Sequence, residues 1–188
     1  MDAASYLANH FLIAVPALSD PNFSRGVTLL CQHNEDGAMG ILINRLSNYR
    51  LGDILAQMDI STDNAELAAA PVLAGGPVQP ERGFVLHEPT EQTWDSSFRI
   101  SDQLNLTTSR DILAAMARGD GPRRAVVALG YAGWGAGQLE NELQQNAWLA
   151  VSADPSICFD TEIEQRWAAA ARLMGIDMSL LTAYAGHA

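Results

Sequence analysis

The 188-residue chain contains no lysine: its 11 basic residues are all arginine, against 22 aspartates and glutamates. The missing lysine excludes Schiff-base catalysis by a lysine amine and phosphate-binding loops that depend on lysine. The net charge of −11 disfavours nucleic-acid binding, because basic side chains that neutralise phosphates supply much of that affinity. The only adjacent basic pair is Arg123-Arg124, so we do not expect direct nucleic-acid binding.

Cysteine and metal-ligand patterns are also scarce. The two cysteines, Cys31 and Cys158, lie far apart and imply no disulfide framework. Cys31 belongs to the apolar run 27–31, which favours a buried, reduced thiol. The four histidines show no His-x-x-x-His spacing, and no Cys-x-x-Cys pair is present. The sequence therefore predicts no metal site and no cofactor.

Long hydrophobic runs are absent as well. Proline, aspartate, glycine or arginine interrupts every apolar run well before the roughly 20 residues that a membrane-spanning helix needs. The first eight residues are acidic and lack the basic start of a secretory signal. We expect a cytoplasmic protein without membrane association. Its 48% hydrophobic and 18% charged residues suit one folded domain over residues 1–188.

Apolar periodicity predicts strands that occur both in groups and in strand–helix–strand units, which favours an α+β fold over a doubly wound sheet. The expected strands are 11–15, 27–32, 39–44, 72–74, 82–87, 98–100, 104–106, 124–131 and 147–152. A hairpin turn is expected at residues 34–37, a turn at 20–22 and a glycine-rich turn after 131. The expected helices are 51–58, 63–70, 110–118, 138–145 and 162–174.

Three segments carry a resemblance to a known family. The first begins Asn-His-Phe-Leu-Ile-Ala-Val-Pro at residue 9 and ends in Asn44-Arg45. The second is Gly-Gly-Pro-Val at 75–78, followed by Arg-Gly-Phe-Val-Leu-His at 82–87. The third, 129–149, contains Gly-Tyr-Ala-Gly-Trp-Gly-Ala-Gly-Gln, and the chain closes with Gly-His-Ala. Together they resemble the bacterial AlgH/YqgE family over nearly the whole chain.

The resemblance implies a single α+β domain with a branched, barrel-like mixed or antiparallel sheet and flanking helices. It also implies a connection with the regulation of alginate production, for which such proteins are often labelled transcriptional regulators. It transfers no catalytic residues to this chain. Fold likeness alone does not settle function.

The glycine-rich segment 129–143 offers a candidate anion site at a helix start. The dinucleotide and nucleotide phosphate-loop signatures both fail there, and Glu140 and Glu142 in the first helical turns would repel phosphate. A tight turn with Trp134 packed over it is the favoured interpretation. Elsewhere, Cys31 and His33 share a strand, but a cysteine in an apolar run is usually inert.

Two classes of function remain open. The favoured one is a non-enzymatic regulatory or binding protein, acting through an unknown protein partner or a small-molecule ligand, with transcriptional regulation indirect. The alternative is an enzyme or sensor whose pocket is built from the three family segments. No catalytic residue is assigned, and the oligomeric state is open. The candidate ligand-binding residues are Asn44, Arg45, Arg82, His87, Gly133, Trp134, Gly135, Gly137 and Gln138.

Overall fold

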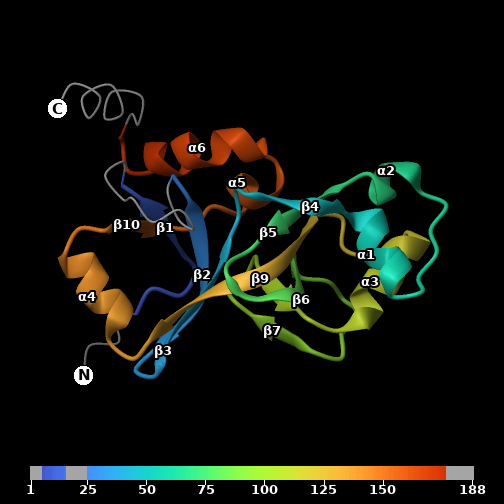
Figure 1. Ribbon diagram of the computed structural model, residues 1–188, viewed down its shortest axis with the longest axis horizontal. Helices are drawn as coiled ribbons and strands as arrows, with labels where there is room; N and C mark the ends of the chain where they lie inside the picture. The colour runs from blue at the N-terminus through green and yellow to red at the C-terminus, as the bar shows by residue number, and fades with distance from the viewer. Residues whose placement is uncertain (1–5, 16–24, 177–188) are drawn as a thin grey trace.

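The longest strand, β9 (Ala125–Gly135), runs through the middle of the molecule and joins its two halves (Figure 1). The computed structural model describes residues 6–15 and 25–176, so the expected turn at 20–22 and the closing Gly-His-Ala lie outside the described residues. All described strands belong to one sheet that includes β9. Because β9 pairs with three other strands, the sheet branches along it.

The carboxyl-terminal half of β9 carries an antiparallel meander. It pairs with β3 (Gly37–Leu42), and the sheet continues through β2 (Val27–Asn34) and β1 (His10–Ala14) to β10 (Trp148–Ser152). Asn34 pairs with Gly37, so the hairpin turn expected at 34–37 is confirmed.

The amino-terminal half of β9 has a partner on each edge. On one edge, β6 (Val78–His87) pairs antiparallel and leads to β8 (Asn105–Thr107) and β7 (Ser97–Arg99). On the other edge, β5 (Pro71–Ala74) pairs in parallel and carries β4 (Leu46–Arg50). The expected α+β fold with a branched, barrel-like sheet is confirmed.

Three glycines allow the backbones to meet at the branch. A Cβ on Gly75 would lie 2.4 Å from the Gly130 carbonyl oxygen, and one on Gly76 would lie 2.1 Å from the Tyr131 carbonyl carbon. Gly130 has a left-handed φ of 78°, and its own Cβ would lie 2.4 Å from the Gly76 oxygen. No side chain fits at such distances, so the branch requires glycine both within β9 and directly after β5.

Gly130 also changes which face of the sheet the side chains of β9 point to. Val127 and Leu129 belong to one apolar cluster, whereas Ala128 and Tyr131 contribute to another. In a regular strand Leu129 and Tyr131 would share a face, because successive side chains alternate. The left-handed residue between them shifts this alternation, as irregular strand positions do.

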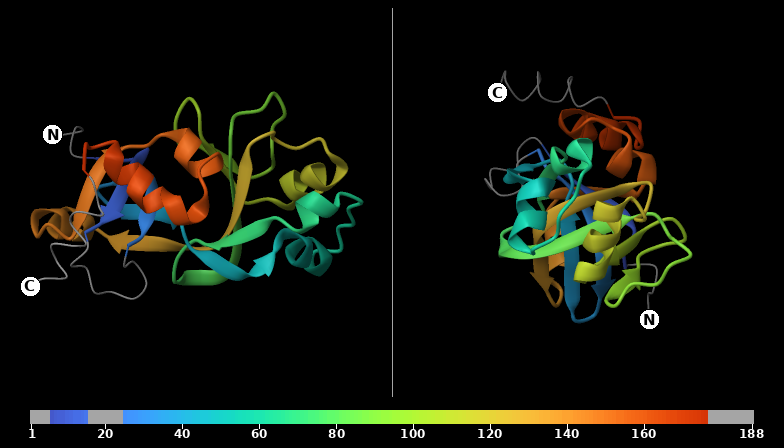
Figure 2. Two further views of the ribbon diagram at one scale, coloured as in Figure 1. Left: turned by 90° about the horizontal axis from the view of Figure 1, so that it is seen from above. Right: turned by 90° about the vertical axis from the view of Figure 1, so that its right-hand side faces the viewer.

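The helices cover the sheet in separate groups. At one end lie α1 (Leu51–Gln57), α2 (Ala65–Ala68) and α3 (Arg110–Arg118) (Figure 1). Near β1 and β2 lie α5 (Pro155–Phe159), a 3₁₀ turn (Ile163–Gln165) and α6 (Arg166–Arg172) (Figure 2). The short α4 (Gln138–Gln144) follows β9 and packs its buried Leu139 beside Trp134 and Trp148.

The structure differs from the expected local structure at four places. The glycine-rich turn expected after residue 131 is shorter than expected: residues 132–135 belong to β9 and pair with β3, and only residues 136–137 form the turn before α4. Residues 46–50 form β4, and 155–159 form α5, although neither was expected. The helix expected over 162–174 begins as a 3₁₀ turn and is α-helical only from Arg166 to Arg172.

The branch can be tested with two matched glycine substitutions. Gly130 and Gly137 have similar left-handed φ values, 78° and 74°, but a Cβ on Gly137 would meet nothing within 4 Å. Gly137→Ala should therefore cost only left-handed strain, about 1–2 kcal/mol. Gly130→Ala adds a backbone clash and should cost at least about 2 kcal/mol more, or prevent folding. Urea unfolding of both variants measures this; equal losses would contradict the close approach at the branch.

Candidate functional site

The sheet curls so that its β7 end faces the β2–β3 hairpin, and a cavity of about 830 Å³ lies between them. The hairpin forms one side, β7 and β8 form the other, and β6 and β9 supply the rest of the lining. We call this space the hairpin cavity. The side chains that give it its chemistry include Gln32, Asp36, Arg82, Phe84, Ser97, Phe98, Thr108 and Tyr131. Its volume suits a small molecule.

Arg82 dominates the electrostatics of the hairpin cavity. Its guanidinium carbon lies 5.3 Å from the centre of the Phe84 ring, whose edge-on neighbour is Tyr131 at 5.8 Å between centroids. Among the residues that the structure describes, no carboxylate lies within 4 Å of Arg82 to form an ion pair. The guanidinium can thus offer its donors to an anionic ligand group.

Aromatic and hydroxyl groups surround this arginine. Phe98 is 39% exposed and lines the cavity, where it can stack against a flat ring. The Ser96 and Thr108 hydroxyls also line the cavity, and their oxygens form a hydrogen bond of 2.9 Å with each other. The lining therefore combines one cation, one carboxylate (Asp36), stacking surface and hydroxyls. Arg82 is the group in it that can receive a planar anion.

Only three of the nine predicted ligand-binding residues line the hairpin cavity, namely Arg82, Gly133 and Trp134. The other six lie elsewhere in the fold: Asn44, Arg45, His87, Gly135, Gly137 and Gln138.

Asn44 bridges backbone segments instead of lining a cavity. Its Oδ1 accepts a 2.9 Å hydrogen bond from the Val27 amide, and its Nδ2 donates at 2.9 Å to the Arg25 carbonyl. The next residue, Arg45, accepts a hydrogen bond from the Ala74 amide through its carbonyl oxygen. Both residues thus fix the path of the chain between β3 and β5.

His87 is fully buried within the sheet. Its Nδ1 donates to the Glu88 carbonyl at 2.7 Å, and its Nε2 lies 2.7 Å from Thr107 Oγ1, which is 2.9 Å from Ser97 Oγ. Burial lowers the pKa of His87 below its ordinary value, although the Glu88 carbonyl and carboxylate oppose this shift. His87 is therefore a neutral ring whose nitrogens are both occupied.

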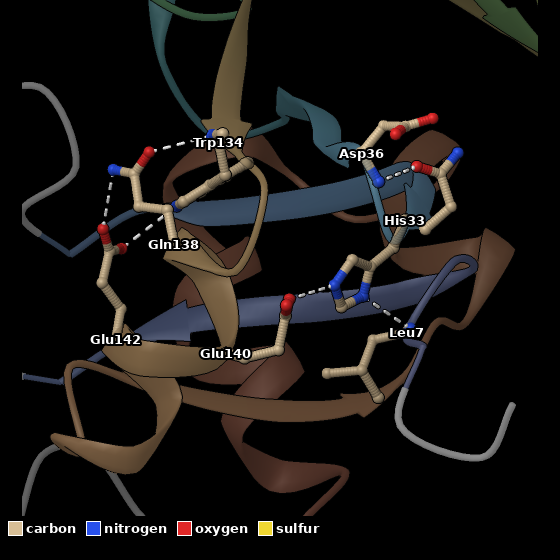
Figure 3. Close-up of polar contacts among 9 residues, drawn as sticks. Leu7, His33, Asp36, Trp134, Gln138, Glu140 and Glu142 are labelled. Atoms are coloured by element: carbon tan, nitrogen blue, oxygen red, sulfur yellow. Dashed lines mark hydrogen bonds and ion pairs between the residues drawn. The ribbon is translucent and has the colours of Figure 1, made fainter. Parts of the chain in front are cut away.

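Glu142 on α4 accepts hydrogen bonds from several side chains near the end of β9 (Figure 3). Its Oε1 accepts from the indole nitrogens of Trp134 at 3.0 Å and Trp148 at 2.9 Å, and its Oε2 accepts from Gln138 at 3.0 Å. Gln138 in turn accepts from the Gly135 amide at 3.0 Å. These contacts occupy Gln138 and join α4 to the sheet.

A second polar pair, His33 with Glu140, was not expected from the sequence (Figure 3). The His33 side chain is fully buried, its Nδ1 accepts from the Leu7 amide at 2.9 Å, and its Nε2 lies 2.5 Å from Glu140. Because Nδ1 accepts, Nε2 carries the proton and donates it to the carboxylate. One ring nitrogen holds the Leu7 amide and the other holds Glu140, so His33 cannot serve as a base for Cys31.

The two cysteines are buried and unpaired. Burial raises the pKa of the Cys31 thiol far above its ordinary value and raises that of Cys158 to about 12. Nearby Arg166 and Arg124 only partly offset the effect at Cys158. Both groups are therefore thiols and not thiolates at neutral pH, and they lack nucleophilic character.

Two further kinds of feature are absent from the part of the chain that the structure describes. In residues 6–15 and 25–176, no group of three or more histidine, cysteine or acidic side chains is placed to hold a metal ion. None of the helices in these ranges has the length and apolarity needed to cross a membrane.

Comparison with known proteins identifies the family. A family model described as AlgH-like matches residues 11–179. The chain belongs to the AlgH-like family. It is 59% identical to a UPF0301 protein of Xanthomonas campestris, covering 97% of this chain and 96% of that protein. It is 58% identical to one of Stenotrophomonas maltophilia, covering 96% of each.

Solved structures agree with this AlgH-like membership. The solution structure of the AlgH protein from Pseudomonas aeruginosa matches with a TM-score of 0.81 and 47% identity, over 97% of this chain and 96% of that one. The crystal structure of protein DIP2367 from Corynebacterium diphtheriae matches with a TM-score of 0.73 at 17% identity, over 94% and 91%. The second likeness concerns the fold alone.

The lowered pKa of His87 makes the stability of this AlgH-like protein depend on pH. As pH falls below the ordinary histidine value of about 6.5, the unfolded chain takes up the proton before the folded one does. The stabilisation is thus complete above that pH and is lost as pH falls through the folded pKa. The His87→Gln variant should lack this pH-dependent part of the unfolding free energy, because glutamine does not titrate. The difference in unfolding free energy between wild type and variant should therefore shrink from pH 7.5 to pH 5.

Urea unfolding at several pH values measures this difference, and carboxylate contributions common to both proteins cancel. A difference that is constant with pH would contradict a neutral, buried His87.

Proposed function

We propose that this AlgH-like protein is a non-catalytic binding protein whose hairpin cavity takes a small planar anion. The observation that carries the proposal is Arg82: it lines the cavity, lies over the Phe84 ring, and has no carboxylate partner among the described residues. An arginine held this way favours a carboxylate or phosphate, while Phe98 and the neighbouring hydroxyls suit a ring with polar substituents.

Binding without catalysis fits the lining better than an enzyme does. The titratable side chains that line the hairpin cavity are Asp36, Arg82 and Tyr131. His87 and His33 each have both ring nitrogens engaged, and neither lines the cavity. A general base must reach the proton it abstracts, and neither histidine is placed to do so from its present contacts. Asp36 is then the one basic group among the described residues of the lining, with no second titratable group of suitable pKa beside it to complete an acid–base pair.

A regulatory role is part of the proposal, with the ligand as the signal and an unknown protein partner as the receiver. Direct DNA contact is disfavoured by the net charge of −11. A gel-shift experiment at physiological salt is the check on this point, and tight sequence-selective binding would contradict it.

The ligand class can be tested by thermal shift with nucleoside monophosphates and aromatic carboxylates. A ligand that binds only the folded protein stabilises it by about 2.7 kcal/mol at 100-fold its Kd. We expect such anions to raise the Tm, and Arg82→Ala to abolish the rise.

The control is Arg118→Ala, which removes the same charge from the exposed end of α3, where Arg118 pairs with Asp120. It should leave the shift intact. A flat response to the whole anion panel, or an equal loss in both variants, would contradict the proposal.

A further inference from the structure

A second cavity, of about 540 Å³, lies on the other side of β6. Arg82 lines the hairpin cavity, whereas Glu81, Gly83 and Val85 line the second space. Phe84 and Thr108 contribute to both linings and stand between the two cavities. Helices α1 and α3 and strand β9 complete its lining. We call it the helix cavity.

Much of the helix-cavity lining is aliphatic, although Thr107, Thr108 and Ser109 also contribute to it. Its deeper lining consists of residues that are only 3–9% exposed, contributed by both helices and both strands: Ile54, Val85, Leu113, Val127 and Leu129. These side chains offer no hydrogen-bonding groups, so the space suits an apolar group.

Gly83 keeps the helix cavity open. A Cβ built on this residue would meet nothing within 4 Å, and its φ lies outside the left-handed range, so the backbone does not require glycine here. Glycine weakens a strand by roughly 0.5–1 kcal/mol relative to alanine. An aliphatic side chain at this position would fill the space without strain. Because the backbone does not require glycine at position 83, we attribute the glycine to the cavity volume that it leaves free.

The rim of the helix cavity is polar and carries negative charge. Tyr49, which is 43% exposed, and Gln57 line it together with Glu81, the only charged residue in the lining. No arginine within the described residues pairs with Glu81. Arg110 donates to the Met58 carbonyl beside the cavity but does not line it.

We infer that the helix cavity is a second ligand site, and that its ligand has a compact apolar body and a cationic amine. The apolar body fills the space in front of Gly83, and the amine lies near Glu81 at the rim. Because the rim carboxylate is exposed to solvent, it sets a preference of a few-fold for a cation over a neutral group. Carboxylates are repelled from this site and belong to the hairpin cavity.

Three probes of similar size test the charge preference: 3-phenylpropylamine, 3-phenylpropanol and 3-phenylpropanoate. Each is titrated into the full chain, and binding is followed by calorimetry and amide NMR. We expect the amine to bind about three-fold more tightly than the alcohol, and to shift the amides of Val127 and Leu129. Glu81→Gln should equalise amine and alcohol. Carboxylate binding in the helix cavity as tight as that of the amine would overturn the inference.

Substitution of Gly83 tests the location. Gly83→Leu should reduce amine affinity at least ten-fold while the Tm stays equal or rises, because the side chain occupies the free space. Gly83→Val provides the same test if the leucine variant does not fold. Amine binding that is unchanged in a folded Gly83 variant, or no amine binding at millimolar concentration, would overturn the inference.

Arg82→Ala is the matched control on the opposite face of β6. It should leave amine binding unchanged while removing the response to anions. If Arg82→Ala abolishes amine binding instead, the amine occupies the hairpin cavity and the inference is wrong. Loss of the anion response alone leaves the helix cavity supported, so failures of the two sites are distinguishable.

Discussion

The close approach of two backbones at Gly75, Gly76 and Gly130 is the constraint on which the rest of the structure depends. It allows β9 to pair with β3 along one half and with β5 along the other, on the same edge. The sheet can then serve two apolar layers, because the left-handed Gly130 moves the side chains after it to the opposite face. A side chain at any of these glycines would force the strands apart and separate the two halves of the molecule.

Local patterns predicted most of the elements, because periodicity reports which face of a helix or strand is buried. Helix α3 was predicted with the bounds that it has. The turn of the β2–β3 hairpin was predicted at the residues where it lies. The failures have a common physical cause. Residues 132–135 and 46–50 contain few apolar residues in alternation, and they are strands because neighbouring strands distant in sequence supply their hydrogen bonds. No short-range signal could reveal those partners.

The candidate site was harder to predict than the fold for a related reason. Polar residues such as Asn44, His87 and Gln138 stand out in the sequence, but in the structure they satisfy backbone groups or one another. A buried polar group without a partner is costly, so unusual polar residues are often needed for the scaffold itself. Arg82 was expected because it flanks an apolar run, whereas Phe98 and Thr108 are ordinary in their local sequence and meet only through folding.

The charges of Glu81 and Arg82 determine which ligand charge each of the two cavities beside β6 favours. The net charge of −11 opposes the approach of any anion, but salt screens such repulsion beyond about 8 Å under physiological conditions. An anion site in this protein must therefore rest on one cation in direct contact with the ligand, and Arg82 is placed to provide it. A cation needs no such contact to be attracted, and Glu81 adds to a field that already favours it. Adjacent side chains of one strand, Glu81 and Arg82, thus present opposite charges to two neighbouring cavities.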